Sequence, residues 1–125
     1  MKIKILVVDD EPGLTRMIKL NLERTGKFEV RTENRGASAI EVAREFDPDI
    51  IFLDIMLPDV PGDAIAERIR ADERLQSKKL VFLTAIVTRD DTADGHNEIG
   101  GHQFLAKPVS TKDLLRTIEK LLPES

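Results

Sequence analysis

The sequence predicts an α/β fold, in which one domain spanning residues 1–125 is built on a doubly wound parallel β-sheet. Short apolar runs alternate five times with segments of helical periodicity, which is typical of βαβ units with right-handed crossovers. Most of the runs are apolar throughout, as expected for strands that are covered on both faces. A chain of 125 residues also has the usual size of one domain.

The expected strands cover residues 3–8, 28–32, 50–53, 80–83 and 104–106. The second of these, from Phe28 to Thr32, alternates apolar and polar side chains, whereas the others are apolar almost throughout. A strand with one polar face belongs at the edge of a sheet, and apolar strands belong inside it. The strand order 2-1-3-4-5 satisfies this requirement.

The first expected helix begins near Pro12, which suits a first helical turn, and Gly26 is a natural stop. Its predicted core face consists of Leu14, Met17, Ile18 and Leu22. Two further helices are expected at about 37–46 and 63–74.

The last helix is expected to begin at Ser110, with Asp113 three residues later in a variant of the capping box. Its predicted core face consists of Leu114, Leu115, Ile118, Leu121 and Leu122. The segment 88–101 is richer in charge and contains three glycines, so we expect only a weak helix there.

Composition excludes several classes of function. The chain has no cysteine, which rules out disulfides, thiolate metal sites and thiol catalysis and suits a reducing, cytoplasmic location. A net charge of −4 argues against a nucleic-acid surface. The apolar runs are far too short for a membrane span, and we expect neither a cleavable signal nor a second, effector domain.

Reactive side chains follow four of the predicted strands. Asp9 and Asp10 follow the first strand, Asp54 the third, Thr84 the fourth and Lys107 the fifth. Because parallel strands end at one edge of a sheet, we expect these side chains to converge. Clustered carboxylates are the hard oxygen ligands that Mg²⁺ prefers, and a lysine suits a phosphoryl oxygen. The pattern therefore predicts a divalent-metal and phosphoryl site. A cis peptide bond is expected before Pro108, because the lysine must turn back towards Asp54.

Together these motifs resemble the receiver domain of bacterial two-component response regulators, and the resemblance covers the whole chain. It implies a flavodoxin-like (βα)5 fold, with Asp54 as the phosphoacceptor. It also implies that Asp9, Asp10, Asp54 and the backbone carbonyl of Met56 bind Mg²⁺. Thr84 and Lys107 match the phosphoryl-binding pair, and Thr84 and Phe104 match the switch positions.

The resemblance further implies a signalling role rather than an enzyme that turns over a separate substrate. The expected phosphodonor is a sensor histidine kinase or a histidine phosphotransfer protein, and the output is contact with a downstream protein target. A weak homodimer through helix 4, strand 5 and helix 5 is a further expectation. Phe104 lacks the hydroxyl of the tyrosine common at this position, so a switch here would work by packing.

Plainer interpretations remain open for single residues. Asp9 and Asp10 alone could be the acidic start of a helix, and Thr84 alone could be an ordinary strand-end residue. His96 and His102 are more simply surface histidines than ligands. A flavin carrier on the same fold is the alternative function, but the chain has neither Trp nor Tyr to stack on a flavin ring. A further alternative is a constitutive interaction module that needs no phosphate, but the intact acid set argues against it.

Overall fold

The computed structural model describes residues 2–85, 98–99 and 102–123. Its elements, in chain order, are β1 (Ile3–Val8), α1 (Pro12–Glu23), β2 (Phe28–Glu33), the 3₁₀ turn η1 (Gly36–Ser38), α2 (Ala39–Phe46), β3 (Ile50–Asp54), α3 (Gly62–Ala71), β4 (Lys79–Thr84), β5 (Glu98–Ile99), β6 (His102–Ala106) and α5 (Thr111–Leu121). The predicted strands all form, and the strand expected at 104–106 is β6.

The strands form one sheet in the order β2-β1-β3-β4-β6-β5. Every pairing from β2 to β6 is parallel, which confirms the predicted order 2-1-3-4-5 with β6 as the fifth strand. The half-polar strand β2 lies at an edge, and the apolar strands β1, β3 and β4 lie inside, as their sequence patterns predict.

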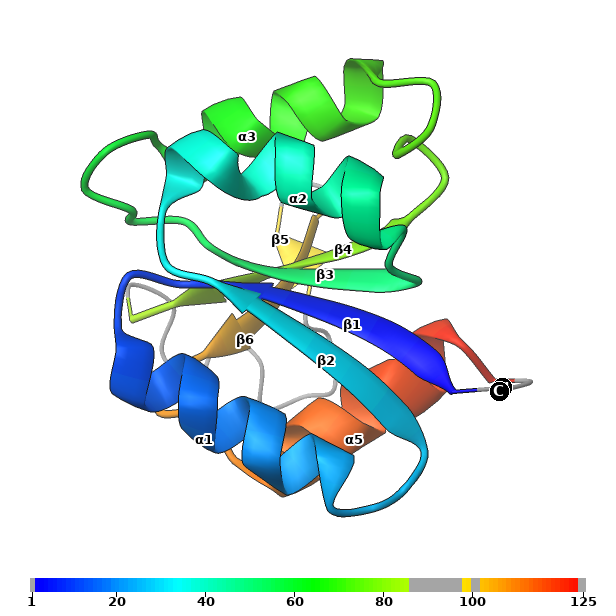
Figure 1. The fold of residues 1–125 in the computed structure, drawn as a ribbon. Helices are drawn as coiled ribbons and strands as arrows, with labels where there is room; N and C mark the ends of the chain where they lie inside the picture. Colours follow the sequence, from blue (N-terminus) through cyan, green and yellow to red (C-terminus); the bar gives the residue numbers. More distant parts are fainter. Residues whose placement is uncertain (1, 86–97, 100–101, 124–125) are drawn as a thin grey trace.

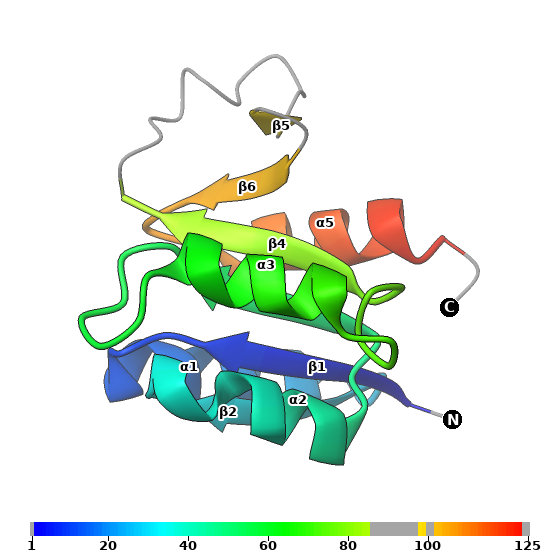
Figure 2. The ribbon, with the colours of Figure 1, turned by 90° about the horizontal axis from the view of Figure 1, so that it is seen from above.

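Helices cover both faces of the sheet. Figure 1 shows α2 and α3 on one face and α1 and α5 on the other, and Figure 2 shows the strands in order between them. Each face has its own apolar core, because successive side chains of a buried strand point to opposite faces. In β1, Leu6 and Val8 pack with the α2 and α3 side, and Ile5 and Val7 pack with the α1 and α5 side.

The prediction of a helix across 88–101 is wrong at its carboxyl end. Glu98 and Ile99 form the short strand β5, which pairs antiparallel with β6. Gly100 and Gly101 separate the paired residues in the sequence, and Gly-Gly is typical of a two-residue hairpin connection. The remainder of that prediction, and His96, lie outside the described residues, as does the side chain of His102.

The helices differ from expectation in detail. Met17 is exposed, because the buried stripe of α1 passes through Thr15, Ile18 and Leu22 instead. The third helix ends at Ala71 rather than near residue 74. The predicted cap of α5 is present, since the Asp113 amide donates to Ser110 Oγ over 3.0 Å.

Two other observations concern the chain as a whole. The peptide bond between Lys107 and Pro108 is cis, as predicted. Among the helices of the described residues, none has the length and apolar character needed to cross a membrane.

Candidate functional site

The predicted site residues are delivered to one edge of the sheet by the ends of four parallel strands. Asp9 follows β1, Asp54 ends β3, Thr84 ends β4 and Lys107 follows β6. The backbone fixes their positions: the Asp9 amide donates to Glu33 O over 3.0 Å, and the Lys107 amide donates to Thr84 O over 2.9 Å. Both contacts extend the hydrogen bonding of the sheet beyond its last paired residues.

The three acids converge as expected. Asp9, Asp10 and Asp54 each offer a carboxylate oxygen, and these oxygens lie within 4.8 Å of one another. Asp9 has no exposed surface and Asp54 only 3%, whereas Asp10 is exposed. Two acids of the cluster are therefore buried, and the third is exposed to solvent.

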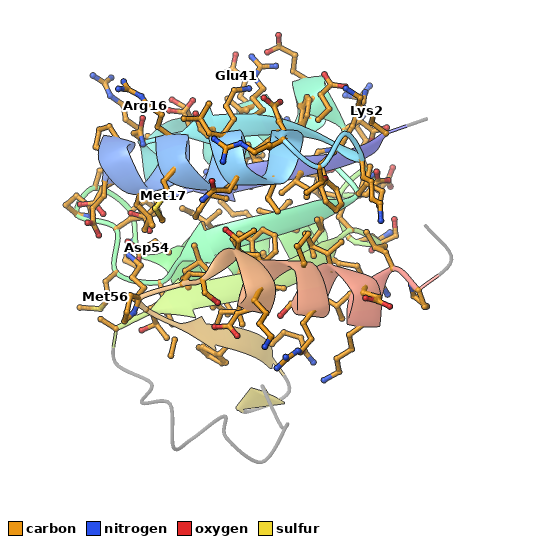
Figure 3. All side chains as sticks on the ribbon, turned by 90° about the horizontal axis from the view of Figure 1, so that it is seen from below. Lys2, Arg16, Met17, Glu41, Asp54 and Met56 are labelled. Carbon is orange, nitrogen blue, oxygen red and sulfur yellow. The ribbon has the colours of Figure 1, made fainter. Side chains whose placement is uncertain are left out.

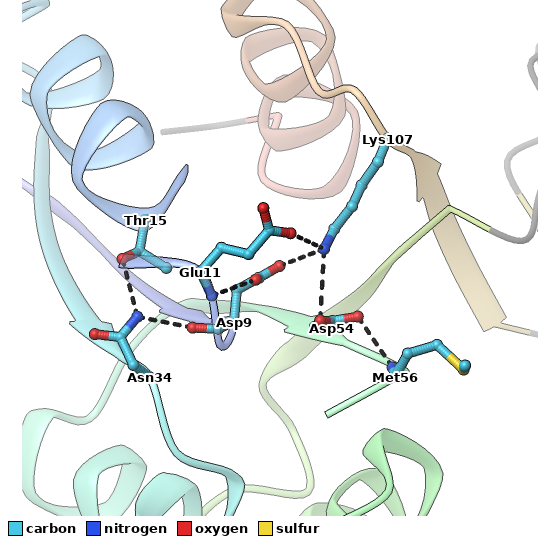
Figure 4. Close-up of polar contacts among 7 residues, drawn as sticks. All are labelled: Asp9, Glu11, Thr15, Asn34, Asp54, Met56 and Lys107. Carbon is cyan, nitrogen blue, oxygen red and sulfur yellow. Dashed lines mark hydrogen bonds and ion pairs between the residues drawn. The ribbon is translucent and has the colours of Figure 1, made fainter. Parts of the chain in front are cut away.

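Lys107 extends from the end of β6 towards Asp9 and Asp54 (Figure 4). Its Nζ lies 2.7 Å from Asp9 Oδ2, 3.5 Å from Asp54 Oδ2 and 3.4 Å from Glu11 Oε1. One ammonium thus serves three carboxylates. Thr84, buried at the end of β4, completes the predicted set.

The electrostatics of the pair Asp9 and Lys107 follow from this crowding. Burial raises the pKa of Asp9 above its ordinary value, and the charge of Asp54 adds to this effect; contact with Lys107 only partly offsets it. Burial by itself would lower the pKa of Lys107, but the contacts with Asp9, Asp54 and Glu11 outweigh it and raise that pKa. The ammonium is therefore held in its charged form.

The loop after β3 holds Asp54 from the opposite side. The amide of Met56 donates to Asp54 Oδ1 over 3.0 Å, while Oδ2 faces Lys107. The Met56 side chain itself is 63% exposed. Figure 3 shows Met56 beside Asp54 at the end of the molecule opposite to Lys2. Met56 therefore contacts Asp54 through its backbone amide, and its side chain extends into solvent.

Phe104 is displaced from the acid cluster and belongs to the α2 and α3 core. Its ring packs on Phe82 of the neighbouring strand, with centroids 5.3 Å apart and ring planes at 30°. Phe104 therefore contributes packing between the neighbouring strands β4 and β6.

Sequence reasoning missed two residues that contact the site, Glu11 and Asn34, and a third, Asp59, in the loop that follows Asp54. Glu11 contacts Lys107, and its amide donates to Asp9 Oδ1 over 3.0 Å. Asn34 donates to the backbone carbonyl of Asp9 over 2.8 Å. Asp59 accepts from the amides of residues 36 and 37. Only Glu11 had a usable signal, since it directly follows the acid pair.

The donor set fits a hard divalent cation. Asp9 Oδ2 is buried and has the Lys107 ammonium nearby, but it receives no aligned hydrogen bond from the described residues. A buried carboxylate with a raised pKa and spare acceptor capacity gains from a positive partner. With Asp10 and Asp54 it could supply the oxygen ligands that Mg²⁺ takes together with water.

Comparison with known proteins agrees with this geometry. Residues 5–119 match the family model of the response regulator receiver domain. The chain belongs to the receiver domain family of two-component response regulators.

Relatives of known sequence and structure are consistent with this assignment. The DNA-binding dual master transcriptional regulator RpaA of Synechocystis sp. is 33% identical over 119 residues, which are 95% of this chain and 48% of that protein. The chain spans about half the length of the curated relatives that it matches.

Solved structures show the same fold. A putative response regulator from Chloroflexus aurantiacus has 27% identity and a TM-score of 0.82, with 99% of this chain and 100% of that chain covered. The chemotaxis response regulator CheY4 of Vibrio cholerae has 24% identity and a TM-score of 0.81, with 98% and 100% covered. The CheY-like, flavodoxin-type fold is therefore established.

Proposed function

We propose that this chain is a phosphoryl-accepting response regulator that takes a phosphoryl group from a phosphohistidine donor onto Asp54. The observation that carries the proposal is the convergence of Asp9, Asp10 and Asp54 with Lys107 at one sheet edge. Lys107 is shared by Asp9, Asp54 and Glu11, so these acids do not each have a cation of their own at this site.

The chemistry needs one oxygen of Asp54 to attack phosphorus. The Met56 amide fixes Oδ1, which orients the carboxylate and leaves Oδ2 towards Lys107. In the transfer, an Asp54 oxygen bonds to phosphorus while the bond from phosphorus to the imidazole nitrogen of the donor breaks. The electron pair of that bond stays on the imidazole, and the product is an acyl phosphate.

Three kinds of group around Asp54 support the transfer. Asp9, Asp10, Asp54 and the carbonyl of Met56 would hold Mg²⁺, which would neutralise the charge that develops on the phosphoryl oxygens. Lys107 would bind one of these oxygens through its ammonium. Thr84 would donate its hydroxyl to another. No separate metabolite is turned over, because the chain catalyses only its own phosphorylation and dephosphorylation.

The partners follow from the same proposal. The donor would be a sensor histidine kinase or a histidine phosphotransfer protein in the cytoplasm, and the output would be contact with a downstream protein. Phosphorylation would shift a two-state equilibrium at Thr84 and Phe104. The packing of Phe104 on Phe82 supports a switch of this kind, because repacking one ring would move the other.

Intact-mass spectrometry tests the function directly. Incubation with acetyl phosphate and Mg²⁺ is expected to add one phosphoryl group to the wild type and none to Asp54→Asn. Asp49→Asn is the matched control, because it removes an exposed acid at the opposite end of β3 and should be labelled like the wild type. Labelling of Asp54→Asn at the wild-type level, or no labelling of the wild type, would contradict the proposal.

A further inference from the structure

The four residues 34–37, hereafter the 34–37 segment, contact the acid pair at one end. Asn34 Nδ2 donates to the carbonyl of Asp9 over 2.8 Å and to Thr15 Oγ1 over 3.1 Å (Figure 4). Thr15 Oγ1 in turn donates to Pro12 O over 3.2 Å. Asn34 thereby joins the backbone at Asp9 to the first turn of α1. The loop between β1 and α1 is therefore held at both of its ends.

The same segment contacts the phosphoacceptor loop at its other end. The amides of Gly36 and Ala37 donate to the two carboxylate oxygens of Asp59, over 3.1 Å and 2.9 Å. Asp59 lies in the loop between β3 and α3 that also carries Met56. These hydrogen bonds hold the pKa of Asp59 below its ordinary value, and the one from the Ala37 amide has the largest effect. The carboxylate is therefore charged at neutral pH.

The 34–37 segment is itself constrained. Glu33 Oε1 accepts from the amides of Asn34 and Arg35, over 3.1 Å and 3.2 Å. A Cβ added at Gly36 would lie 3.0 Å from Asp59 Oδ1 and 3.0 Å from a methyl group of Ile65. The close approach of Asp59 thus depends on the missing side chain, and the contact has little freedom to change.

We propose that the 34–37 segment sets the spacing between the two loops of the cation site, with Asn34 and Asp59 as its positioning residues. Neither side chain touches the acid cluster as a ligand. Asn34 acts through the backbone of Asp9 and Asp10, and Asp59 acts through the loop that presents Met56. This inference deepens the proposed function and rests on it for the presence of a cation.

The physical reason lies in the repulsion among the three acids. Without a cation, like charges within 4.8 Å favour movement of the two loops apart. A cation would then have to draw them together and order them, which weakens its binding. Two hydrogen-bonded contacts to one short segment keep the loops at the binding distance beforehand. Supporting contacts of this kind commonly set the precision of a metal site.

Calorimetric titration of the wild type and variants with Mg²⁺ tests the inference. Asn34→Leu keeps the approximate size of the side chain and removes both donors. Asp59→Asn replaces one of the two acceptor oxygens with a donor. We expect Mg²⁺ to bind each variant roughly fivefold more weakly, within the range set by the loss of one net hydrogen bond. Asn34→Asp should also bind more weakly, although its added negative charge alone would strengthen cation binding.

Three controls separate positioning from general effects. Asn21→Leu makes the same replacement at a half-buried site on α1, and Asp63→Asn removes an exposed charge from the first turn of α3. Ile118→Val lowers stability in the core beneath α5. All three should bind Mg²⁺ as the wild type does, and urea unfolding of every variant gives the stability against which the affinities are compared.

The outcomes are distinct. Wild-type affinity in both Asn34→Leu and Asp59→Asn overturns the inference and leaves the proposed function intact. An equal loss in Ile118→Val shows that affinity follows stability alone and also overturns it. If the wild type does not bind Mg²⁺, or if Asp9→Asn binds it equally well, the proposed function fails and the inference fails with it.

Discussion

The acids at the two edges of the sheet have opposite surroundings. At the amino edge, where the strands begin, each has its own partner: Asp47 pairs with Lys78 over 2.7 Å, and Asp72 accepts from Arg44 Nε over 2.7 Å. At the carboxyl edge, Asp9 and Asp54 share Lys107 with Glu11. Aspartates at the amino edge thus have separate cationic partners, whereas Asp9 and Asp54 at the carboxyl edge share one.

The pKa values of Asp47, Asp72 and Asp9 differ in the same way. The hydrogen bonds to Lys78 and Arg44 lower the pKa of Asp47 and of Asp72. Burial raises the pKa of Asp9. A lowered pKa means that the fold stabilises the charged acid, and a raised one means that the fold is strained by it. Asp47 and Asp72 therefore stabilise the fold in their charged forms, whereas buried Asp9 would gain from a further positive partner.

The largest expected effect is a steric one at the carboxyl edge. A Cβ on Gly62 would lie 2.5 Å from Asp54 O and from Ile55 Cα, so the backbone at Asp54 and Ile55 would have to shift. Gly62→Ala should lower the free energy of unfolding by about 3 kcal/mol, the upper range for overpacking. Gly13→Ala, with no atom within 4 Å of the added carbon, should stabilise α1 by up to about 1 kcal/mol.

Urea unfolding measures both changes, and acetyl phosphate labelling of Gly62→Ala below its unfolding range reports the distortion of the site. Equal stability of the two alanine variants would show that the loop after β3 accommodates a side chain and is not closely packed.

Mg²⁺ should act on one edge alone. A ligand that binds only the folded protein stabilises it by about 2.7 kcal/mol at one hundred times its dissociation constant. We expect this gain in the wild type and in Asp72→Asn, but a much smaller gain in Asp10→Asn. Unfolding in the presence of Mg²⁺ or of a chelator measures it. Indifference of the wild type to Mg²⁺ would remove the distinction between the edges.

Neutralising one acid at each edge should shift the metal-free stability in opposite directions. Asp10→Asn relieves repulsion with Asp9 and Asp54 and should raise the free energy of unfolding slightly. Asp72→Asn weakens the contact with Arg44 and should lower it. Thermal unfolding in a chelator compares the two variants. A shift of the same sign in both would mean that the two edges do not differ in the way we describe.

The pH dependence should separate the edges as well. The folded chain binds the proton on Asp9 more tightly than the unfolded chain does, so this residue's contribution to stability falls as pH rises above about 3.8. Asp72 behaves oppositely, because its stabilising contribution is present above 3.8 and is lost as pH falls through its lowered folded pKa. In a chelator, the stability of Asp9→Asn relative to the wild type should therefore increase with pH.

For Asp72→Asn the deficit relative to the wild type should shrink as the pH falls below about 3.8. Urea unfolding across this pH range gives both curves. Parallel curves for the two variants would contradict the opposite pKa directions.

Most of the fold could be predicted from local sequence. Apolar runs identified four strands of the parallel sheet, and an alternating pattern identified the strand at its edge. The polar residues that follow the apolar strands identified Asp9, Asp54, Thr84 and Lys107 as neighbours. These signals work because the carboxyl ends of parallel strands meet, whatever the loops between them do. Met17 was misplaced because a helical pattern allows more than one buried stripe. The strand at 98–99 was missed because the glycines of this segment were interpreted as weakening a helix.

The contacts that brace the site could not be predicted in this way. Asn34 contacts Asp9, which lies 25 positions away in the sequence, and Asp59 contacts Ala37, which lies 22 positions away. Asn and Asp in loops are ordinary turn residues, and nothing in their own sequence neighbourhood names a partner. Such pairs depend on how two loops lie in space, which only the folded chain determines.

The central claim is that Asp54, rather than another acid of the cluster, accepts the phosphoryl group. Borohydride reduces an acyl phosphate to an alcohol, so it would convert the phosphorylated aspartate to homoserine and leave free carboxylates unchanged. After labelling with acetyl phosphate and Mg²⁺, reduction and peptide sequencing by mass spectrometry, we predict homoserine at position 54. Homoserine at position 9 or 10, or at none of the three, would contradict the claim.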